Sequence, residues 1–421
     1  MTDNNENKVL NVPHLRFPEF SGEWEIYPLT DFMSFKNGMN PDAKRFGRGT
    51  KFISVMDILN NQFICYDNIR ASVEVVDGDI ETYGVNYGDI LFQRSSETLE
   101  DVGQANVYLD SKPAVFGGFV IRGKSKSNYY PMFFRYLLAS PTARKKIIVK
   151  GAGAQHFNIG QDGLSKVCLN IPSIQEQEKI AKLFECIDTR IATQNKIIED
   201  LKKLKSAIID KSFCYPNESS PQKRFIGFTE EWHLVHLSDI CQRVRTKNFN
   251  TQCTLVLTIA AQFGLVSQEE FFNKSVASDN LEGYYLLRKG DFAYNKSYSG
   301  DYAWGAVKRL ECFSEGVLSP LYICFRPDTA RIDSDFLAHY FESKKWYKGI
   351  ADIAGEGARN HGLLNLSVID YFKTLHRIPS IQEQKAIANA LNKLTSKISI
   401  EKNLYDDLLL QRQHLLQQMF I

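Results

Sequence analysis

The chain has 421 residues, of which 43% are hydrophobic and 24% are charged, a composition typical of a globular protein with room for two or three domains. No apolar run reaches the roughly 20 residues of a membrane span, and the start MTDNNENKVLNVPHLRF lacks the basic and apolar regions of a signal peptide, so we expect a cytoplasmic protein. The eight cysteines and eight histidines are scattered without a metal-ligand spacing, and we assign no metal site to them.

The heptapeptide IPSIQEQ occurs twice, at Ile171–Gln177 and at Ile378–Gln384. Other segments match in the same order: RFPEFSGEWEIYPLTDF and RFIGFTEEWHLVHLSDI, GDILFQRSS and GDFAYNKSY, GAGAQ and GEGAR. These matches indicate a duplicated unit of about 200 residues, which is too long for a solenoid repeat.

In chain order, the patterns predict a globular domain at 1–172, a long helix at 173–214, a second globular domain at 215–379 and a second long helix at 380–421. Each globular domain combines short apolar runs and turn residues with one helical pattern, YPMFFRYLLASPTARKKI or DSDFLAHYFESKKWYKGI. The predicted fold class is therefore mixed α+β.

Each copy of IPSIQEQ has the features of a helix start. The proline biases the preceding residue toward an extended conformation, so a strand is expected to end there. Ser173 and Ser380 are expected to act as N-caps, and Glu176 and Glu383 are placed to complete a capping box by reaching back to the N-cap N–H. About 40 residues without Gly or Pro follow, enough for a helix of about 60 Å.

Both predicted helices carry apolar residues at alternating spacings of four and three, which is typical of a coiled-coil seam. The seam residues are Ile180, Phe184, Ile187, Ile191, Ile198, Leu201 and Ile208 in the first helix, and Ile387, Leu391, Leu394, Ile398, Tyr405, Leu408 and Leu415 in the second. Polar residues interrupt both seams at equivalent places, Gln194 with Glu401 and Lys205 with Arg412. We expect the two helices to pair with each other, antiparallel and with a pseudo-twofold relation between the duplicates; the alternative is a coiled coil between two chains.

Two motifs with catalytic associations do not fit their chemistry. GFVIRGKS at Gly118–Ser125 matches the letters of a phosphate-binding loop, but its middle residues predict a strand and no helix pattern follows. EQK at Glu383–Lys385 matches the end of a nuclease signature, but a metal-dependent nuclease needs a second converging carboxylate, and none is suitably spaced. The chain also lacks the Asn/Asp-Pro-Pro-aromatic run of adenine methyltransferases, so we predict a protein without catalysis of its own.

The segments FQRSS and YNKSY follow equivalent Gly-Asp turns and combine residue types that can bind bases and phosphates. The alternative interpretation is a solvated strand edge. The two long helices account for the formal charge of +2, so any nucleic-acid surface on the globular domains must be local. The candidate nucleic-acid contacts are Lys36, Arg45, Gln93, Arg94, Ser95, Ser96, Gln155, His156, Arg245, Lys247, Gln262, Tyr294, Asn295, Lys296, Ser297, Tyr298, Arg359 and Asn360.

Two globular domains, each followed by a long helix that opens with IPSIQEQ, resemble the specificity subunit of type I restriction-modification systems. The resemblance implies two target recognition domains that read the halves of a bipartite double-stranded DNA target, here asymmetric because the domains differ, with the helices setting the spacing. It also implies docking of two modification subunits at the joints formed by Ser173, Glu176, Gln177, Ser380, Glu383 and Gln384. Restriction subunits would join the complex, and S-adenosylmethionine, ATP and Mg²⁺ would belong to the partner subunits, with no cofactor or membrane contact for this chain. The rival classes are a self-contained enzyme and a coiled-coil adaptor.

Overall fold

A computed structural model describes residues 11–260, 264–274, 280–297, 302–354, 359–360 and 363–421. The chain forms two compact units: unit 1 comprises residues 1–195 and 403–421, and unit 2 comprises residues 196–402. The structure contains helices and strands throughout both units, which confirms the mixed α+β class.

Unit 1 is built on an antiparallel sheet with the strand order β2-β10-β6-β8. These strands are β2 (Met33–Asn37), β10 (Val120–Ser125), β6 (Ile90–Gln93) and β8 (Ala105–Val107). A second four-stranded sheet contains β4 (Ala71–Val73), β3 (Phe46–Ile53), β9 (Ala114–Phe116) and β5 (Gly84–Val85), with β3 and β9 parallel. Two strand pairs complete the unit, β1 (Glu25–Pro28) with β12 (Cys168–Ile171) and β7 (Ser95–Ser96) with β11 (Phe157–Asn158). Its short helices are α1 (Val55–Asn60), α2 (Asp79–Tyr83), α3 (Pro131–Ala139), α4 (Pro141–Ile148) and α5 (Gln161–Ser165).

Unit 2 repeats this framework. Its four-stranded sheet has the order β14-β21-β18-β19, formed by β14 (Cys241–Arg243), β21 (Ile323–Pro327), β18 (Phe292–Asn295) and β19 (Ala306–Arg309). The pair β13 (His233–His236) with β24 (Leu375–Ile378) matches β1 with β12. Further pairs are β15 (Leu257–Ala260) with β16 (Gly264–Ser267), β17 (Tyr285–Arg288) with β20 (Glu315–Leu318), and β22 (Arg359–Asn360) with β23 (Leu363–Leu364). Its short helices are α7 (Leu237–Ile240), α8 (Gln268–Phe272), α9 (Ser334–Glu342), α10 (Tyr347–Ile353) and α11 (Val368–Phe372).

The single helical pattern predicted in each domain is wrong in one respect, because each is split into two helices. In unit 1 the break lies at Ser140, whose Oγ accepts a hydrogen bond from the Ala143 N–H, 3.3 Å away, and so caps α4. Pro141 then occupies the first helical turn, where its missing N–H costs nothing. In unit 2 the corresponding pattern forms α9 and α10.

The duplicated Gly-Asp turn precedes an inner strand in each unit, β6 in unit 1 and β18 in unit 2. Gly88 and Gly290 have positive φ angles of +88° and +94°, a conformation that favours glycine. The aspartates that follow are buried and tie the turn together: Asp89 accepts from the N–H groups of Asn86 and Ser125, each 3.0 Å away. Asp291 accepts the equivalent bond from the Arg288 N–H at 2.8 Å and also forms an ion pair with Arg326, at 2.6 Å between Oδ1 and Nε. This turn is therefore structural in both units.

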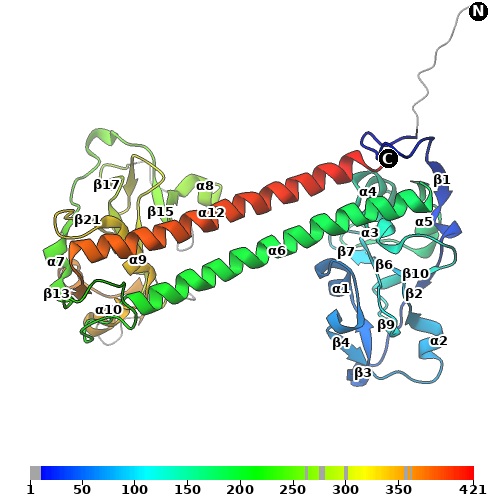
Figure 1. The fold of residues 1–421 in the computed structure, drawn as a ribbon, viewed down its shortest axis with the longest axis horizontal. Helices are drawn as coiled ribbons and strands as arrows, with labels where there is room; N and C mark the ends of the chain where they lie inside the picture. The colour runs from blue at the N-terminus through cyan, green and yellow to red at the C-terminus, as the bar shows by residue number, and fades with distance from the viewer. Residues whose placement is uncertain (1–10, 261–263, 275–279, 298–301, 355–358, 361–362) are drawn as a thin grey trace, which may run out of the picture. The chain divides into compact units, whose positions relative to one another are not determined.

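The two long helices are α6 (Ile174–Ser212) and α12 (Ile381–Gln418), which begin directly after Ser173 and Ser380 as predicted (Figure 1). All predicted seam residues, polar ones included, are buried or half-buried. In unit 1 the start of α6 packs against the end of α12, where the rings of Phe184 and Phe420 lie 5.8 Å apart. In unit 2 the end of α6 shares a core with the start of α12, including Phe213 and Leu391. Within each unit the helices thus run antiparallel, and the pairing is intramolecular.

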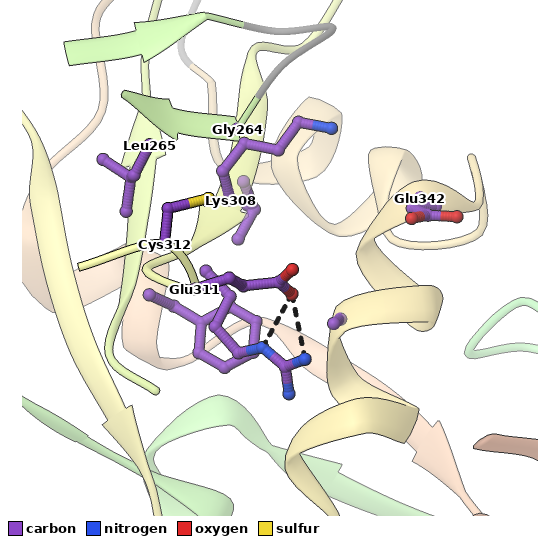
Figure 2. Close-up of a pocket in the computed structure, with 10 residues that line it drawn as sticks. Gly264, Leu265, Lys308, Glu311, Cys312 and Glu342 are labelled. Carbon is purple, nitrogen blue, oxygen red and sulfur yellow. Dashed lines mark hydrogen bonds and ion pairs between the residues drawn. The ribbon is translucent and has the colours of Figure 1, made fainter. Parts of the chain in front are cut away.

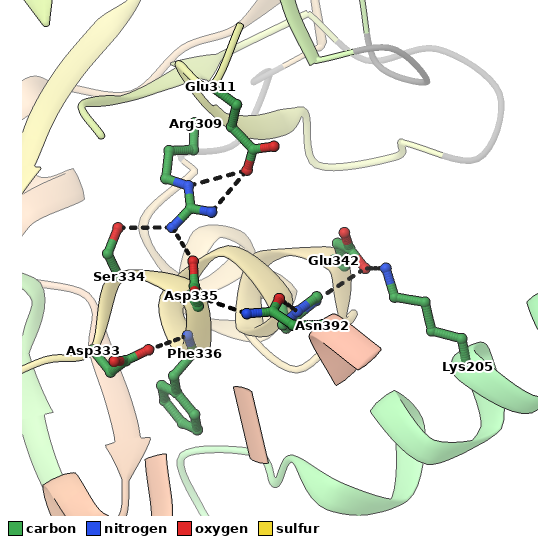
Figure 3. Close-up of polar contacts among 10 residues, drawn as sticks. Lys205, Arg309, Glu311, Asp333, Ser334, Asp335, Phe336, Glu342 and Asn392 are labelled. Atoms are coloured by element: carbon green, nitrogen blue, oxygen red, sulfur yellow. Dashed lines mark hydrogen bonds and ion pairs between the residues drawn. The ribbon is translucent and has the colours of Figure 1, made fainter. Parts of the chain in front are cut away.

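The equivalent basic residues of the seam each pair with a carboxylate of their own unit. Lys205 lies 2.8 Å from the Glu342 carboxylate at the end of α9 (Figure 3). Arg412 pairs with Asp188. Burial alone would raise the pKa of Glu342, but the neighbouring His339 and the charge of Lys205 outweigh it and lower the pKa to about 2. These pairs explain how basic side chains fit beside an otherwise apolar seam.

Candidate nucleic-acid interface

The last glutamine of the repeated heptapeptide makes equivalent hydrogen bonds in both units. In unit 1, Gln177 Oε1 accepts from the Tyr130 N–H at the start of α3, 3.1 Å away, while Nε2 donates to the Pro172 carbonyl at 3.0 Å. In unit 2, Gln384 makes the same two bonds, to the Asp333 N–H at 2.7 Å and to the Pro379 carbonyl at 2.9 Å. The glutamine therefore joins the long helix to the preceding strand end and to the helix that packs beside it.

The glutamate of the heptapeptide holds the chain that leads into each unit. Glu176 accepts from Arg16 through both oxygens, at 2.8 Å each, and Glu383 accepts from Arg224 at 2.8 and 2.7 Å. The Trp24 Nε1 also donates to Glu176, at 3.3 Å. We call each set of Arg, Glu and Gln a joint clamp. The first comprises Arg16, Glu176 and Gln177, and the second comprises Arg224, Glu383 and Gln384.

The joint clamps correct two expectations. Ser173 does cap α6, because its Oγ accepts from the Glu176 N–H at 3.4 Å, but within the described residues no hydrogen bond joins the Glu176 or Glu383 carboxylate to an N-cap N–H. The carboxylates are occupied by arginine, which is the stronger partner. Glu176, Gln177, Glu383 and Gln384 are only 1–3% exposed, so these four side chains bind internally and cannot form the docking surface predicted for them.

Unit 1 brings together most of its predicted DNA contacts at the end of β6. Ser95 and Ser96 form β7, which pairs with β11, and Ser95 Oγ donates to Asn158 Oδ1. The Arg94 carbonyl accepts from the Ile159 N–H at 2.9 Å. Gln155 and His156 are exposed in the turn before β11. We call Gln93–Ser96 with Gln155–Asn158 the first strand-end site.

Unit 2 has an equivalent second strand-end site at Asn295–Ser297, which follows β18. The Lys296 carbonyl accepts from the Leu364 N–H at 3.0 Å, repeating the bond between Arg94 and Ile159. Asn295, Lys296 and Ser297 are half-buried, and Asn295 Oδ1 accepts from the Ser297 N–H at 2.9 Å. The two sites therefore share a backbone arrangement and differ in their side chains.

Three candidate residues, Tyr294, Arg45 and Gln93, have structural roles within their own units. Tyr294 is fully buried, its ring stacked on Tyr371 at 4.7 Å and its hydroxyl bonded to the Trp304 carbonyl, so it belongs to the core. Arg45 is held by an ion pair to Asp79 and by a 2.8 Å bond from its Nε to the Glu74 carbonyl.

Gln93 is 5% exposed and donates to the Ser95 carbonyl, so its side chain supports the backbone of the first strand-end site.

The other candidates lie apart from the strand-end sites or outside the described residues. Lys36 is exposed on β2, with its Nζ 5.4 Å from the centroid of the Tyr83 ring, and Arg245 and Lys247 are exposed beyond β14. Gln262 and Tyr298 lie outside the described residues, as do the side chains of Arg359 and Asn360.

The sequence reasoning missed an apolar surface beside the first strand-end site. Phe119 is 69% exposed at the tip between β9 and β10, and the Phe119 carbonyl accepts from the Arg94 N–H at 2.9 Å. Arg94 Nη1 donates to the Gly118 carbonyl at 3.2 Å. A hollow of about 420 Å³ adjoins them, with Ser95 and Met56 in its wall. The signal was the run GGF, a glycine pair followed by an aromatic residue.

A polar hollow of about 180 Å³ in unit 2 is lined by charged side chains of β19 and α9 (Figure 2). Arg309 contacts Glu311 at 2.9 Å and Asp335 at 2.6 Å (Figure 3). Burial lowers the pKa of Lys308. Asn392 of α12 donates to Asp335 at 2.8 Å. The charged side chains around the hollow therefore pair with one another. Through Asp335, they link β19 of the sheet to the long helix α12.

No group of three or more His, Cys, Asp or Glu side chains suited to a metal ion occurs in the part of the chain that the structure describes. Among the same residues, no helix is long and apolar enough to cross a membrane.

The structure thus contains a duplicated α+β framework that presents different polar side chains at two equivalent strand ends. Comparisons with known proteins relate this chain to one family. Residues 21–203 match the family model described as the type I restriction modification DNA specificity domain. The chain is 22% identical over 418 residues to the type I restriction enzyme MjaVIII specificity subunit of Methanocaldococcus jannaschii, covering 94% of this chain and 91% of the relative. It is 26% identical over 245 residues to the putative MjaX specificity subunit of the same organism, covering 55% of this chain and 56% of the relative.

Among solved structures, the type I restriction-modification S subunit from M. genitalium shares the fold, with a TM-score of 0.52 and 14% identity over 97% of this chain and 99% of that one. The sequence of this chain is therefore similar to those of type I restriction-modification specificity subunits.

Proposed function

We propose that this protein directs a type I restriction-modification complex to an asymmetric bipartite DNA target, with unit 1 reading one half and unit 2 the other. The observation that carries the proposal is the pair of strand-end sites. They share the backbone bonds from Ile159 to Arg94 and from Leu364 to Lys296, yet present Arg94, Ser95 and Ser96 in one unit and Lys296 and Ser297 in the other. Equal frameworks with unequal side chains suit two different half-sites.

In this proposal the chain has no catalytic step of its own. Two modification subunits dock along the exposed faces of α6 and α12 and methylate adenine with S-adenosylmethionine, and restriction subunits use ATP and Mg²⁺. The cytoplasmic location expected from the sequence stays a prediction. Methylation of DNA by the purified chain with cofactor alone would favour an enzyme instead, and absence of any DNA-sequence effect in the full complex would favour an adaptor.

The spacer between the half-sites is the first quantity to test. One heptad inserted in α6 after Asn195 and one in α12 after Lys402 leaves each unit intact and keeps the seam in phase, because both insertions fall at the unit boundaries. Seven residues add roughly 10 Å of helix, about three base pairs of duplex. Mapping the methylated sequence should show a changed spacer between unchanged half-sites.

An insertion in α6 alone is the control, since it shifts one helix against the other and should abolish methylation. An unchanged spacer with heptads in both helices would show that the helices do not set it.

The two strand-end sites provide a second test. Arg94→Ala and Lys296→Ala are each expected to relax sequence preference in one half-site only, at a cost of about 1–3 kcal/mol for that half-site, if the side chains contact bases. Affinities for duplexes with single base changes in either half measure this. Equal weakening on all sequences with a shallower salt dependence would assign the side chains to phosphates.

A further inference from the structure

Unit 2 carries a ridge of three basic residues that its duplicate lacks. Arg243, Arg245 and Lys247 alternate along an extended segment, so their side chains share one face, while Val244 and Asn248 are buried. We call the three the basic ridge.

The backbone beneath the basic ridge is hydrogen-bonded along its length. The Val244 N–H donates to the Cys324 carbonyl at 2.9 Å. The Leu286 N–H donates to the Thr246 carbonyl at 3.0 Å, and Lys247 pairs with Tyr285 in an antiparallel bridge. The positions of the three charges are therefore set by the sheet and not by a free loop.

Aromatic and carbonyl groups hold two of the side chains in place. Arg243 Nη2 donates to the Tyr285 hydroxyl at 3.2 Å, and Lys247 Nζ lies 3.7 Å from the centroid of the same ring. Lys247 also donates to the Gly283 carbonyl at 2.5 Å. Within the described residues, no carboxylate forms an ion pair with any member of the basic ridge. In the part of the chain that the structure describes, the three charges of the basic ridge thus have no carboxylate partner.

The surface next to the basic ridge is concave. A hollow of about 530 Å³ is lined by Arg243, Arg245 and Lys373 together with Val368 and Phe372. The exposed Lys373 adds a fourth cation, 3.9 Å from the Asp370 carboxylate. The hollow gives a bulky polyanion room to approach the basic ridge closely.

The matching positions in unit 1 are uncharged. Phe325 of β21 faces Arg243 and Phe292, and Gly123 of β10 faces Phe35 and Ile90 in the same way. By this register, Phe35, Asn37 and Met39 of unit 1 occupy the positions that correspond to Arg243, Arg245 and Lys247 of unit 2. None of them is basic, so the difference is local to unit 2.

We propose that the basic ridge binds consecutive phosphates of one DNA strand beside the half-site read by unit 2, and contributes affinity without sequence preference. Alternate residues of an extended chain lie about 7 Å apart, close to the separation of successive phosphates along a strand. Three cations that have no ion-pair partner among the described residues release counterions from DNA when they bind. This inference rests on the proposed function and makes unit 2 the main source of the salt dependence.

The test uses the full chain in complex with its modification subunits, with a cognate and a scrambled duplex. Arg245→Ala combined with Lys247→Ala should reduce the slope of log K against log salt by about 0.9 for each lost contact, on both duplexes. Between 50 and 200 mM salt, the fall in affinity should then be roughly tenfold smaller than for the wild type. The methylated sequence should not change.

Lys289→Ala is the matched control, an exposed lysine of unit 2 at the opposite end of β17, and should leave the slope unchanged. Thermal unfolding of each variant checks that unit 2 is intact. Should the double variant unfold, Arg245→Ala alone provides the same test, because it changes an exposed side chain.

An unchanged slope, or a new methylated sequence, would overturn the proposal. Weaker assembly with the modification subunits at unchanged DNA affinity would overturn it too and assign the basic ridge to an acidic protein partner. Failure of the wild type to prefer the cognate duplex would instead count against the proposed function.

Discussion

Replacing Glu383 by alanine is expected to lower the free energy of unfolding of unit 2 by about 3–5 kcal/mol. The carboxylate is 1% exposed and accepts two hydrogen bonds from Arg224, whose side chain is 19% exposed. Removing it leaves the guanidinium largely buried without its counter-charge, and that loss exceeds the worth of an exposed ion pair. Three of the four tryptophans lie in unit 2, so urea denaturation of a Trp24→Phe background, followed by fluorescence, reports on this unit.

Two comparisons separate the ion pair from a general effect of mutation. Ser367→Ala removes only the cap of α11, where Ser367 Oγ accepts from the Asp370 N–H at 3.1 Å, and should cost about 1 kcal/mol in unit 2. The double variant Arg224→Met with Glu383→Leu removes both charges and should be less destabilised than Glu383→Ala. A loss below 1 kcal/mol for Glu383→Ala would show that Arg224 finds water or another acceptor in the variant.

Acidification from pH 6.5 to pH 4.5 is expected to destabilise unit 2 by about 2–3 kcal/mol through His376 alone. Its imidazole is buried between the Tyr340 hydroxyl, 2.9 Å from Nδ1, and Thr374 Oγ1, 2.8 Å from Nε2. Burial, aided slightly by the charge of His236, lowers the pKa of His376 from 6.5 to about 3. The unfolded chain takes up a proton below pH 6.5 while the folded chain does not, so stability is complete above pH 6.5 and is lost as the pH falls toward 3.

The duplicate supplies the control for this prediction. Leu169 occupies the place of His376 in the strand pair of unit 1, since Leu169 faces Tyr27 as His376 faces Val235. His376→Leu should be less stable at pH 7 because Tyr340 and Thr374 lose a partner, but its stability should fall less steeply with acid. The same urea titrations at pH 6.5 and 4.5 compare the two slopes; equal slopes would mean that His376 takes up its proton without unfolding.

The sequence predicted the features of this protein that depend on local patterns. The long helices begin at Ile174 and Ile381, directly after the expected caps, because proline, serine and the absence of breakers act within a few residues. The heptad spacing likewise identified the seam. The role of Glu176 was predicted wrongly because its partner, Arg16, lies far away in the chain and only tertiary packing brings them together.

The same limit applies to the strand-end sites. The Gly-Asp turns located both sites, but alternation along a strand does not say which face is covered, and Tyr294 faces a core formed by Tyr371 and Trp346. The backbone bonds from Ile159 to Arg94 and from Leu364 to Lys296 had no signal in the sequence, because they join segments that are far apart along the chain. The duplication could be predicted from the sequence, whereas the hydrogen-bond partner of each polar side chain could be identified only from the packed structure.

The division of the chain has a consequence for its synthesis. Unit 2 is continuous, from residue 196 to residue 402, whereas unit 1 takes residues 403–421 from the far end of the chain. Leu416, Met419 and Phe420 pack in the same core as Trp24 and Phe133. On the ribosome, the early part of unit 1 therefore waits for residues 403–421, which are made after unit 2, so unit 2 has its whole sequence available before unit 1 does. Until then the apolar face of α3 and the start of α6 remain open, so a truncated chain would release a finished unit 2 attached to an unfinished unit 1.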